Sequence, residues 1–212
     1  RDAAFGFYYS DDLDALRTGG AELVEFRPTQ DSALPDVDAL FIGGGFPETH
    51  LQVLQRNSEM RRDIRRFVES GKPVYAECGG LMYLSRSVRW HDQQADMVGA
   101  LPLDITMQER PQGRGYVKLA ETNRFPWPAF ISSTLANRSD QDICAHEFHY
   151  SRAENIDPAI EFAYLVKRGH GVDGKHDGVL FHNVLASYAH QRHTRHNPWT
   201  TRFVQHIQAG KK

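Results

Sequence analysis

The residues with the clearest chemical potential are a thiol and two glycines that follow a short apolar run. Residues 73–76 have the pattern of a buried strand, Cys78 comes two positions later, and Gly79 and Gly80 open an apolar stretch at 81–84 that predicts a helix. A reactive side chain on a tight strand-to-helix turn is open to substrate, and the helix N-terminus favours a thiolate and a nearby oxyanion. Cys78 is therefore a candidate nucleophile. The alternative is an ordinary buried cysteine, which is a common role of this residue.

A second glycine-rich turn follows another apolar run. Gly43, Gly44 and Gly45 come directly after residues 40–42, so their backbone N–H groups are unobstructed and suit an oxyanion or a phosphate. The spacing G-x-x-x-x-G-K-[ST] is absent from the chain, which argues against a nucleotide-binding loop. An oxyanion role beside a nucleophile and a plain glycine turn both remain open from the pattern.

A cysteine nucleophile needs a base, because a thiol at its free pKa is only a few per cent ionised at pH 7. Of the eleven histidines, His190 stands out because it follows a predicted strand at 179–181 and so lies where residues converge at the mouth of a sheet. His146 and His149 have odd spacing on a predicted strand and should point to opposite faces. His193 and His196 lack a nearby cysteine or carboxylate to complete a zinc site, so no metal is predicted.

Helical and extended patterns alternate through residues 11–87. Helices are predicted after Asp11 or Asp12 as far as Gly19, and from Ser58 to Gly71, with buried strands at 21–26, 39–42 and 73–76. This rhythm predicts an α/β fold, with a parallel sheet covered on both sides. Ligands bind at the carboxyl ends of the strands in such sheets, where both glycine turns fall.

The pattern changes between residues 88 and 167. Extended segments are predicted at 101–107, 115–119, 143–150 and 162–167, which we interpret as an antiparallel elaboration of the same core. A further strand is predicted at 179–181 and a closing helix from Asn197 to Ile207. Residues 1–212 are therefore expected to form a single domain.

Composition excludes several functional classes. The 212 residues carry a formal net charge of −2, and 25% of them are charged. This composition lacks the excess of positive charge typical of proteins that bind nucleic acid or an anionic membrane. No run of 18 apolar residues is present. Cys78 and Cys144 do not make a disulfide framework, which favours a reducing, cytoplasmic setting.

Taken together, five segments resemble the glutaminase domain of the cobyrinic acid a,c-diamide synthase family, a class I glutamine amidotransferase of the branch shared with cobyric acid synthase. They occur in the family's order, span nearly the whole chain, and are residues 41–48 (FIGGGFPE), 74–84 (VYAECGGLMYL), 110–117 (RPQGRGYV), 146–151 (HEFHYS) and 186–190 (ASYAH). The resemblance implies a flavodoxin-like class I glutamine amidotransferase fold with a mostly parallel central sheet, helices on both faces and an antiparallel elaboration.

The resemblance also implies roles for single residues. Cys78 would attack the side-chain amide of glutamine, and His190 would act as the base and then protonate the departing ammonia. Backbone N–H groups near Gly44 and Gly79 would hold the oxyanion.

Two charged residues are implied as contacts to the substrate. Arg114 would clamp the carboxylate of glutamine and Glu147 would contact its amine, although each can also be read as an ordinary strand-edge charge. Other class I members place a carboxylate two positions after the histidine, where this chain has Arg192. The resemblance therefore implies a Cys-His dyad whose third member is missing or supplied by another domain.

The complete enzymes of the family, as the resemblance implies, carry an N-terminal synthetase domain that binds ATP and magnesium and phosphorylates acetate side chains of a corrinoid. Ammonia then displaces the phosphate. That domain is absent from this chain, which is expected to be a C-terminal fragment or an isolated glutaminase unit with no cofactor of its own. Relatives that amidate sirohaem-type tetrapyrroles keep the identity of the acceptor open.

Two other functions compete with this one. A cysteine hydrolase or chaperone of the protease-like fold also places cysteine on such an elbow, but usually takes its histidine from the adjacent position, which here is Gly79. A docking domain of the same fold without turnover is the non-enzymatic alternative, against which the presence of Cys78 and His190 argues.

Overall fold

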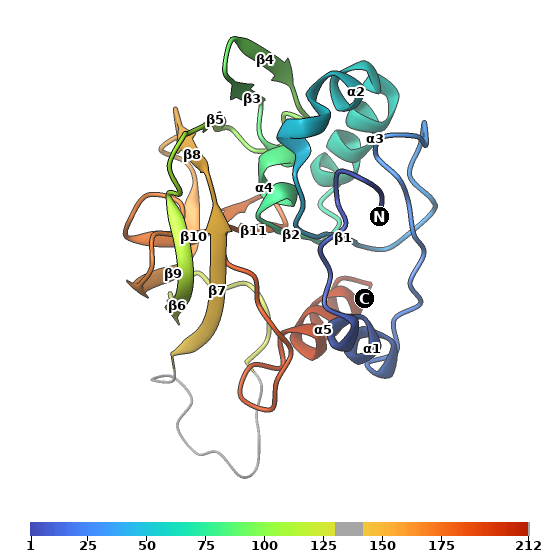
Figure 1. The fold of residues 1–212 in the computed structure, drawn as a ribbon. Helices are drawn as coiled ribbons and strands as arrows, with labels where there is room; N and C mark the ends of the chain where they lie inside the picture. Colours follow the sequence, from blue (N-terminus) through green and yellow to red (C-terminus); the bar gives the residue numbers. More distant parts are fainter. Residues whose placement is uncertain (130–141, 212) are drawn as a thin grey trace.

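A seven-stranded sheet forms the centre of the molecule in the computed structural model, which describes residues 1–129 and 142–211 (Figure 1). The strand order is β1-β2-β11-β10-β9-β6-β7. In chain order these strands are β1 (Leu40–Ile42), β2 (Val74–Glu77), β6 (Gly113–Glu121), β7 (Ile143–His149), β9 (Glu161–Arg168), β10 (His176–Phe181) and β11 (Val184–Ser187).

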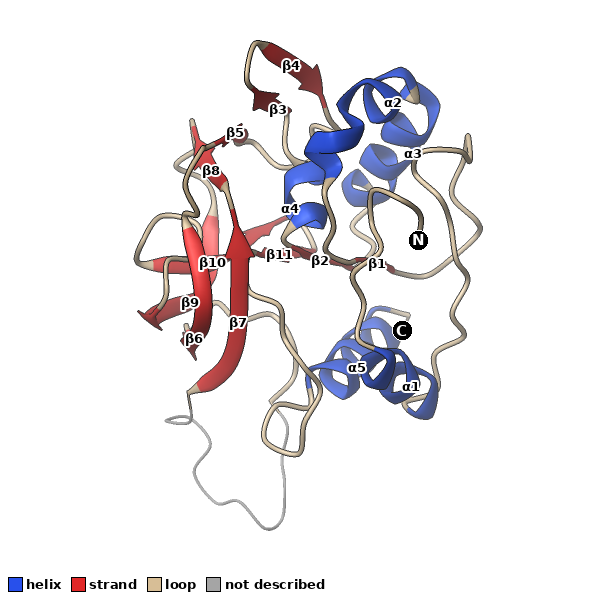
Figure 2. Ribbon diagram, in the orientation of Figure 1, coloured by secondary structure: helices blue, strands red, loops and turns tan. Residues whose placement is uncertain are grey.

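The parallel part of the sheet is short and buried between two layers of helices. Strand β2 pairs in parallel with β1 on one side and with β11 on the other. Helices α2, α3 and α4 lie on one face of these strands, and α1 and α5 lie on the other (Figure 2). Their bounds are α1 (Ser10–Thr18), α2 (Leu51–Arg56), α3 (Ser58–Glu69), α4 (Gly79–Leu84) and α5 (Trp199–Gly210), with a 3₁₀ turn, η1 (Pro47–His50), before α2.

The remaining strands continue the same sheet in antiparallel fashion. Strands β11, β10, β9, β6 and β7 pair antiparallel in that order, with a register shift between Lys118 and Leu119 where β6 meets β9. The sheet curls, so that β7 stands in front of the parallel strands although five places separate it from β2 in the strand order (Figure 1). This curl brings the two ends of the sheet order together.

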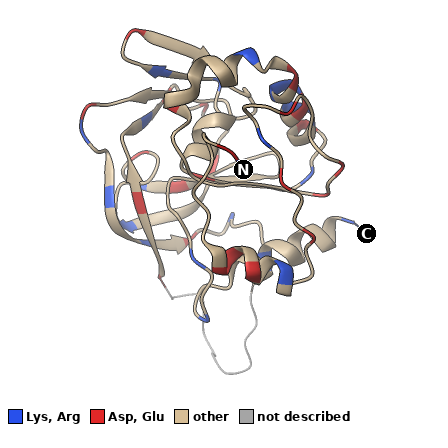
Figure 3. Ribbon diagram, turned by 45° about the vertical axis from the view of Figure 1, so that its right-hand side comes forward, with Lys and Arg blue, Asp and Glu red and all other residues tan. Residues whose placement is uncertain are grey.

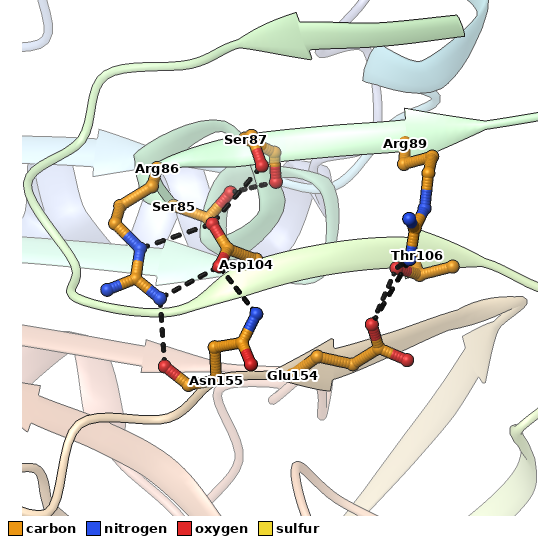
Figure 4. A network of polar contacts seen from close by, with 8 residues as sticks. All are labelled: Ser85, Arg86, Ser87, Arg89, Asp104, Thr106, Glu154 and Asn155. Atoms are coloured by element: carbon orange, nitrogen blue, oxygen red, sulfur yellow. Dashed lines mark hydrogen bonds and ion pairs between the residues drawn. The ribbon is translucent and has the colours of Figure 1, made fainter. Parts of the chain in front are cut away.

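A second sheet of four strands lies beside α4 and α2. Its order is β4-β3-β5-β8, formed by β3 (Ser87–Trp90), β4 (Gln93–Asp96), β5 (Asp104–Met107) and β8 (Ser151–Glu154). A polar network joins three of these strands (Figure 4). Asp104 accepts two hydrogen bonds from Arg86, at 3.1 and 2.8 Å, one from Ser87 at 3.1 Å and one from Asn155 at 3.0 Å.

Two hydrophobic clusters hold the layers together. One lies on the α2–α4 side and contains fully buried Leu54, Met60 and Ile64 from α2 and α3. The other lies on the α1–α5 side, where Tyr75 of β2 packs against Trp199 with ring centroids 4.8 Å apart. Alternate residues of β2 therefore fill opposite layers, as expected of a strand buried on both faces.

The expected α/β class is confirmed, with corrections to its details. The sheet is mixed rather than mostly parallel, because the strands predicted as an elaboration join the central sheet itself. The strand predicted at 21–26 is wrong. That segment is irregular and has no strand partner among the residues described. Together with β1 it lines a cavity of about 560 Å³.

Further corrections concern elements and helix starts. Strands β3, β4, β8 and β11 were not predicted, and α1 begins at Ser10 rather than after Asp11 or Asp12. The residue preceding α3 is Asn57, whose side chain accepts a hydrogen bond from the N–H of Met60, so Asn57 and not Ser58 is the cap.

Charges of both signs are interspersed over the fold (Figure 3). Among the described residues, the helices are too short or too polar to cross a membrane.

Asp104→Asn should lower the free energy of unfolding by about 1 kcal/mol at pH 7, because it removes a charge-assisted pair that solvent partly screens. Hydrogen bonds from Arg86, opposed by burial and aided by Asn155 and Ser87, lower the pKa of Asp104. The pKa of Asp104 is lower in the folded protein than in the unfolded chain, so its ionised form stabilises the fold. This stabilisation is fully present above the unfolded pKa and is lost as the pH falls through the folded pKa. The difference in free energy of unfolding between wild type and Asp104→Asn, measured with urea, should therefore become smaller from about pH 5 to pH 3. Asp92→Asn, in the exposed turn between β3 and β4, is the matched control; an equal loss there would contradict the prediction.

Candidate active site

Cys78 occupies the sharp turn between β2 and α4. Its backbone has φ 46° and ψ −101°, a left-handed conformation that is unusual for a residue with a side chain. Its N–H donates to the carbonyl of Ser187 at 2.7 Å, and its carbonyl accepts the N–H of Met82 at 3.0 Å, which begins the helix. The side chain is buried, with 6% of its surface exposed. The expected nucleophile elbow is confirmed as geometry.

Glycines are required where the loop after β1 meets this turn. A Cβ on Gly79 would lie 2.9 Å from the backbone N and O of Gly45. A Cβ on Gly44 would lie 2.5 Å from Cε1 of His190. The glycine loop after β1 therefore packs directly on the imidazole and on the start of α4. Both glycines named from the sequence thus lie at one place with Cys78 and His190.

His190 reaches the site from a turn that a buried carboxylate holds. The sequence predicts that this turn follows the strand at 179–181. In the structure that strand is part of β10, which forms a hairpin with β11, and the turn follows β11. Asp177 of β10 accepts hydrogen bonds from the Ser187 hydroxyl at 2.7 Å and from the N–H groups of Tyr188 and Ala189 at 2.9 and 3.0 Å. This clamp fixes the three residues before His190.

The His190 imidazole is buried among four side chains. Cys78 lies close enough to affect its protonation, and its Nδ1 lies 3.3 Å from Oε2 of Glu77. Phe7 packs edge-on with ring centroids 4.7 Å apart, and His146 stacks at 5.2 Å. The site thus presents a thiol, an imidazole and a carboxylate in contact.

These contacts determine the protonation of the imidazole. Burial alone lowers the pKa of His190, but the hydrogen bonds and charges of Cys78 and Glu77 outweigh it and raise the pKa to about 10. His190 is therefore protonated at neutral pH when its partners are charged. Burial lowers the pKa of neighbouring His146, and the charge on His190 lowers it further.

Glu77 is the residue that the sequence analysis missed. Its carboxylate is 3% exposed and accepts the Tyr75 hydroxyl at 2.7 Å and the N–H of Gln191 at 3.0 Å, both on Oε1. Consecutive strand residues point to opposite faces, so the sequence pattern carries no signal that Glu77 and Cys78 meet the same group. The left-handed backbone at Cys78 breaks that alternation. A carboxylate of the chain itself therefore lies against the His190 imidazole.

Strand β7 closes the site from the other end of the curled sheet. His146 and His190 exchange two backbone hydrogen bonds, at 3.2 and 2.7 Å, and the thiol of Cys78 lies 3.9 Å from the carbonyl oxygen of Phe148. As expected, His146 and His149 point to opposite faces of β7: His146 lies against His190, whereas buried His149 stacks on Tyr188 at 3.8 Å.

The two residues named as substrate contacts lie in different environments. Arg114 is exposed on β6 and is the strand partner of Phe148, whose carbonyl faces the thiol. Glu147 is buried, and its carboxylate accepts the N–H groups of His170 at 2.7 Å and Gly171 at 2.9 Å. Its pKa is lowered despite burial, because of His149 and these two N–H groups.

Arg192 is exposed and lies two positions after His190. It forms an ion pair with Asp11 of α1 at 2.8 Å and lies over the ring of Tyr9. The position two residues after His190 is thus used to attach the turn to α1. Among the described residues, no group of three His, Cys, Asp or Glu side chains is arranged to hold a metal ion.

Known structures share this architecture. PurLQS from Thermotoga maritima matches with a TM-score of 0.63 and 18% sequence identity, over 95% of this chain and 92% of the other. A further glutamine amidotransferase structure matches with a TM-score of 0.59 and 16% identity, over 95% of this chain and 89% of the other. At these identities the likeness concerns the fold, and it confirms the class I glutamine amidotransferase fold.

Sequence relatives are closer. A cobyrinate a,c-diamide synthase from Magnetococcus marinus is 50% identical over 189 residues, which are 89% of this chain and 38% of the relative. One from Archaeoglobus fulgidus is 45% identical over 205 residues, which are 97% of this chain and 42% of the relative. The chain thus spans about two fifths of the length of the curated relatives it matches. The profile of the CobB/CobQ-like glutamine amidotransferase domain matches residues 1–198, and the chain belongs to this family.

Proposed function

We propose that this chain is a glutaminase domain that releases ammonia from glutamine through Cys78 and His190. The observation that carries the proposal is a thiol on a strand-to-helix elbow beside a buried imidazole, with the glycine loop after β1 packed on both the imidazole and the start of α4. The pKa of that imidazole is raised by Cys78 and Glu77. An imidazolium beside a thiol favours the thiolate, which is the nucleophilic form.

The reaction proceeds in two halves. The sulfur of Cys78 adds to the side-chain amide carbon of glutamine, a C–S bond forms, and backbone N–H groups near Gly44 and Gly79 hold the oxyanion. His190 gives its proton to the amide nitrogen, the C–N bond breaks, and ammonia leaves. Water then attacks the thioester, giving its proton to His190, and glutamate departs as the thiol is restored.

Substrate recognition is assigned to the β6–β7 side of the site. Arg114 is exposed beside the segment whose carbonyl faces the thiol, which suits a clamp on the carboxylate of glutamine. Glu147 would contact the amine, although its two oxygens already accept N–H groups of the chain. Arg114 is therefore the better supported of the two contacts.

The ammonia would serve an ATP-dependent amidation on a synthetase domain outside this chain. The name of the relatives points to the carboxylates of cobyrinate, and a sirohaem-type tetrapyrrole is the other acceptor of the same chemistry. The residues here do not fit ATP or its magnesium: the phosphate-loop spacing is absent from the sequence, and the described residues form no acidic metal cluster. Both would be bound by the synthetase domain.

The glutamine analogue 6-diazo-5-oxo-norleucine should form a covalent adduct on Cys78. Mass spectrometry should find the adduct in wild type, none on Cys78→Ala, and at least about a hundredfold slower labelling of His190→Ala, because the imidazole supports the thiolate. Cys144→Ala, which removes the exposed cysteine, is the control and should label like wild type. Labelling at Cys144 instead, or none even with the synthetase domain added, would refute the assignment.

Gly44→Ala should slow the same labelling by about a hundredfold, because its Cβ would displace the His190 ring. The matched control is Gly210→Ala at the end of α5, where an added Cβ meets nothing within 4 Å. Rates measured by time-resolved mass spectrometry should separate the two variants. Equal rates for Gly44→Ala and wild type would show that the glycine loop does not constrain the imidazole.

A further inference from the structure

We propose that Glu77, the residue immediately before the nucleophile, is the positioning carboxylate of the site: it accepts the Nδ1 proton of His190 in a hydrogen bond and so aims Nε2 at the thiol. The inference rests on the proposed function for its catalytic consequence. Its structural basis is the geometry around one buried carboxylate.

The contacts of Glu77 divide between its two oxygens. Oε2 faces Nδ1 of His190 at 3.3 Å, while Oε1 accepts the Tyr75 hydroxyl at 2.7 Å and the Gln191 N–H at 3.0 Å. Two neutral donors therefore fix the plane of the carboxylate and leave the second oxygen for the imidazole. A buried carboxylate held this way keeps a fixed orientation toward the ring it contacts.

The same hydrogen bonds fix the backbone of the histidine. Gln191 follows His190 directly, so its N–H bond to Glu77 anchors the chain on one side of the imidazole, while Asp177 anchors residues 187–189 on the other. Glu77 thus contacts both the ring and the next peptide group of the same segment. This double contact distinguishes a positioning role from a general electrostatic one.

The left-handed turn makes the arrangement possible. Glu77 closes β2 in register with Ser187, and Cys78 follows at φ 46°. In a regular strand their side chains would point to opposite faces, and only one could meet a given imidazole. With the turn, the carboxylate and the thiol contact the same ring.

Other ionisable groups near the ring do not duplicate this role. His146 stacks on His190, and its pKa is lowered by burial and by the charge on His190. Asp12, Tyr9 and Tyr75 experience the charge of Glu77, and Arg192 is paired with Asp11. Of the described groups, Glu77 and Cys78 are those whose hydrogen bonds favour the charged form of His190.

The proton path follows from these contacts. When Cys78 gives its proton to Nε2, the imidazole carries a positive charge next to the carboxylate of Glu77, and Nδ1–H remains in its hydrogen bond. The Nε2 proton then goes to the departing amide nitrogen. Glu77 itself neither gains nor loses a proton.

The test compares Glu77→Gln and Glu77→Asp with wild type in ¹⁵N,¹³C-histidine-labelled protein, with the His190 resonance assigned by its loss in His190→Gln. In wild type the ring should carry hydrogen on Nδ1 and titrate at about pH 10. Glu77→Gln removes the negative charge and should lower the His190 pKa by about one unit or more. Glu77→Asp keeps the charge and should shift it less. Glu69→Gln, exposed at the end of α3, is the matched control and should not shift it.

Kinetics separate positioning from folding. Glu77→Gln should lower kcat for glutamine hydrolysis about a hundredfold with little change in KM, move the alkaline limb of the pH profile to lower pH, and be partly rescued in Glu77→Asp. If Glu77 were only structural, Glu77→Gln would lower the melting temperature and leave the alkaline limb of the pH profile unmoved. If Glu77→Gln does not fold, the Nδ1 proton of wild type decides: a ring without hydrogen on Nδ1 overturns the inference.

The outcomes for the two proposals are distinguishable. Normal 6-diazo-5-oxo-norleucine labelling with an unmoved His190 titration in Glu77→Gln would overturn the role of Glu77 and leave the glutaminase standing. A shifted titration in a protein that never labels would keep the Glu77–His190 coupling and refute the glutaminase.

Discussion

The backbone of Cys78 imposes the constraint on which the site depends. A left-handed residue at the end of β2 stops the strand, starts α4 and brings the thiol close to the ring that also meets Glu77. Such a conformation costs of order 1–3 kcal/mol for a residue with a side chain and persists only when surrounding contacts enforce it. Here the enforcement comes from the bond between the Cys78 N–H and Ser187 of β11, and from Gly79 packed against the loop after β1. The strain and the glycines are two aspects of one arrangement.

The curl of the sheet supplies the second half of the site. Strand β7 is separated from β2 by four strands in the sheet order, yet its backbone pairs with His190 and its Phe148 carbonyl meets the thiol. The site is therefore assembled from both ends of one sheet, and the hairpin of β10 and β11 lies between these ends in the strand order. Asp177, at the base of that hairpin, couples the order of β10 to the placement of the imidazole.

Local patterns were enough to predict the elements that pack tightly, but they did not predict which strands pair over long sequence separations. The helix through Met60, Ile64 and Phe67 follows from its apolar spacing, and the elbow at Cys78 follows from the run before it and the glycines after it. The strand at 21–26 failed because an apolar run becomes a strand only with a partner, and β1 does not pair with it here. Glu77 could not be identified from the pattern, because its contact with His190 depends on the left-handed backbone of Cys78 and on a long-range pairing.

The difference in exposure between the two cysteines has a practical consequence. Cys78 is 6% exposed, whereas Cys144 is exposed on β7. The size of a reagent, as well as its reactivity, then decides which sulfur it modifies. A bulky maleimide would label exposed Cys144 and so measure the protein concentration. A small electrophile shaped like an amino acid would label Cys78 and so measure the concentration of reactive sites. Each molecule thus carries its own internal standard for active-site titration.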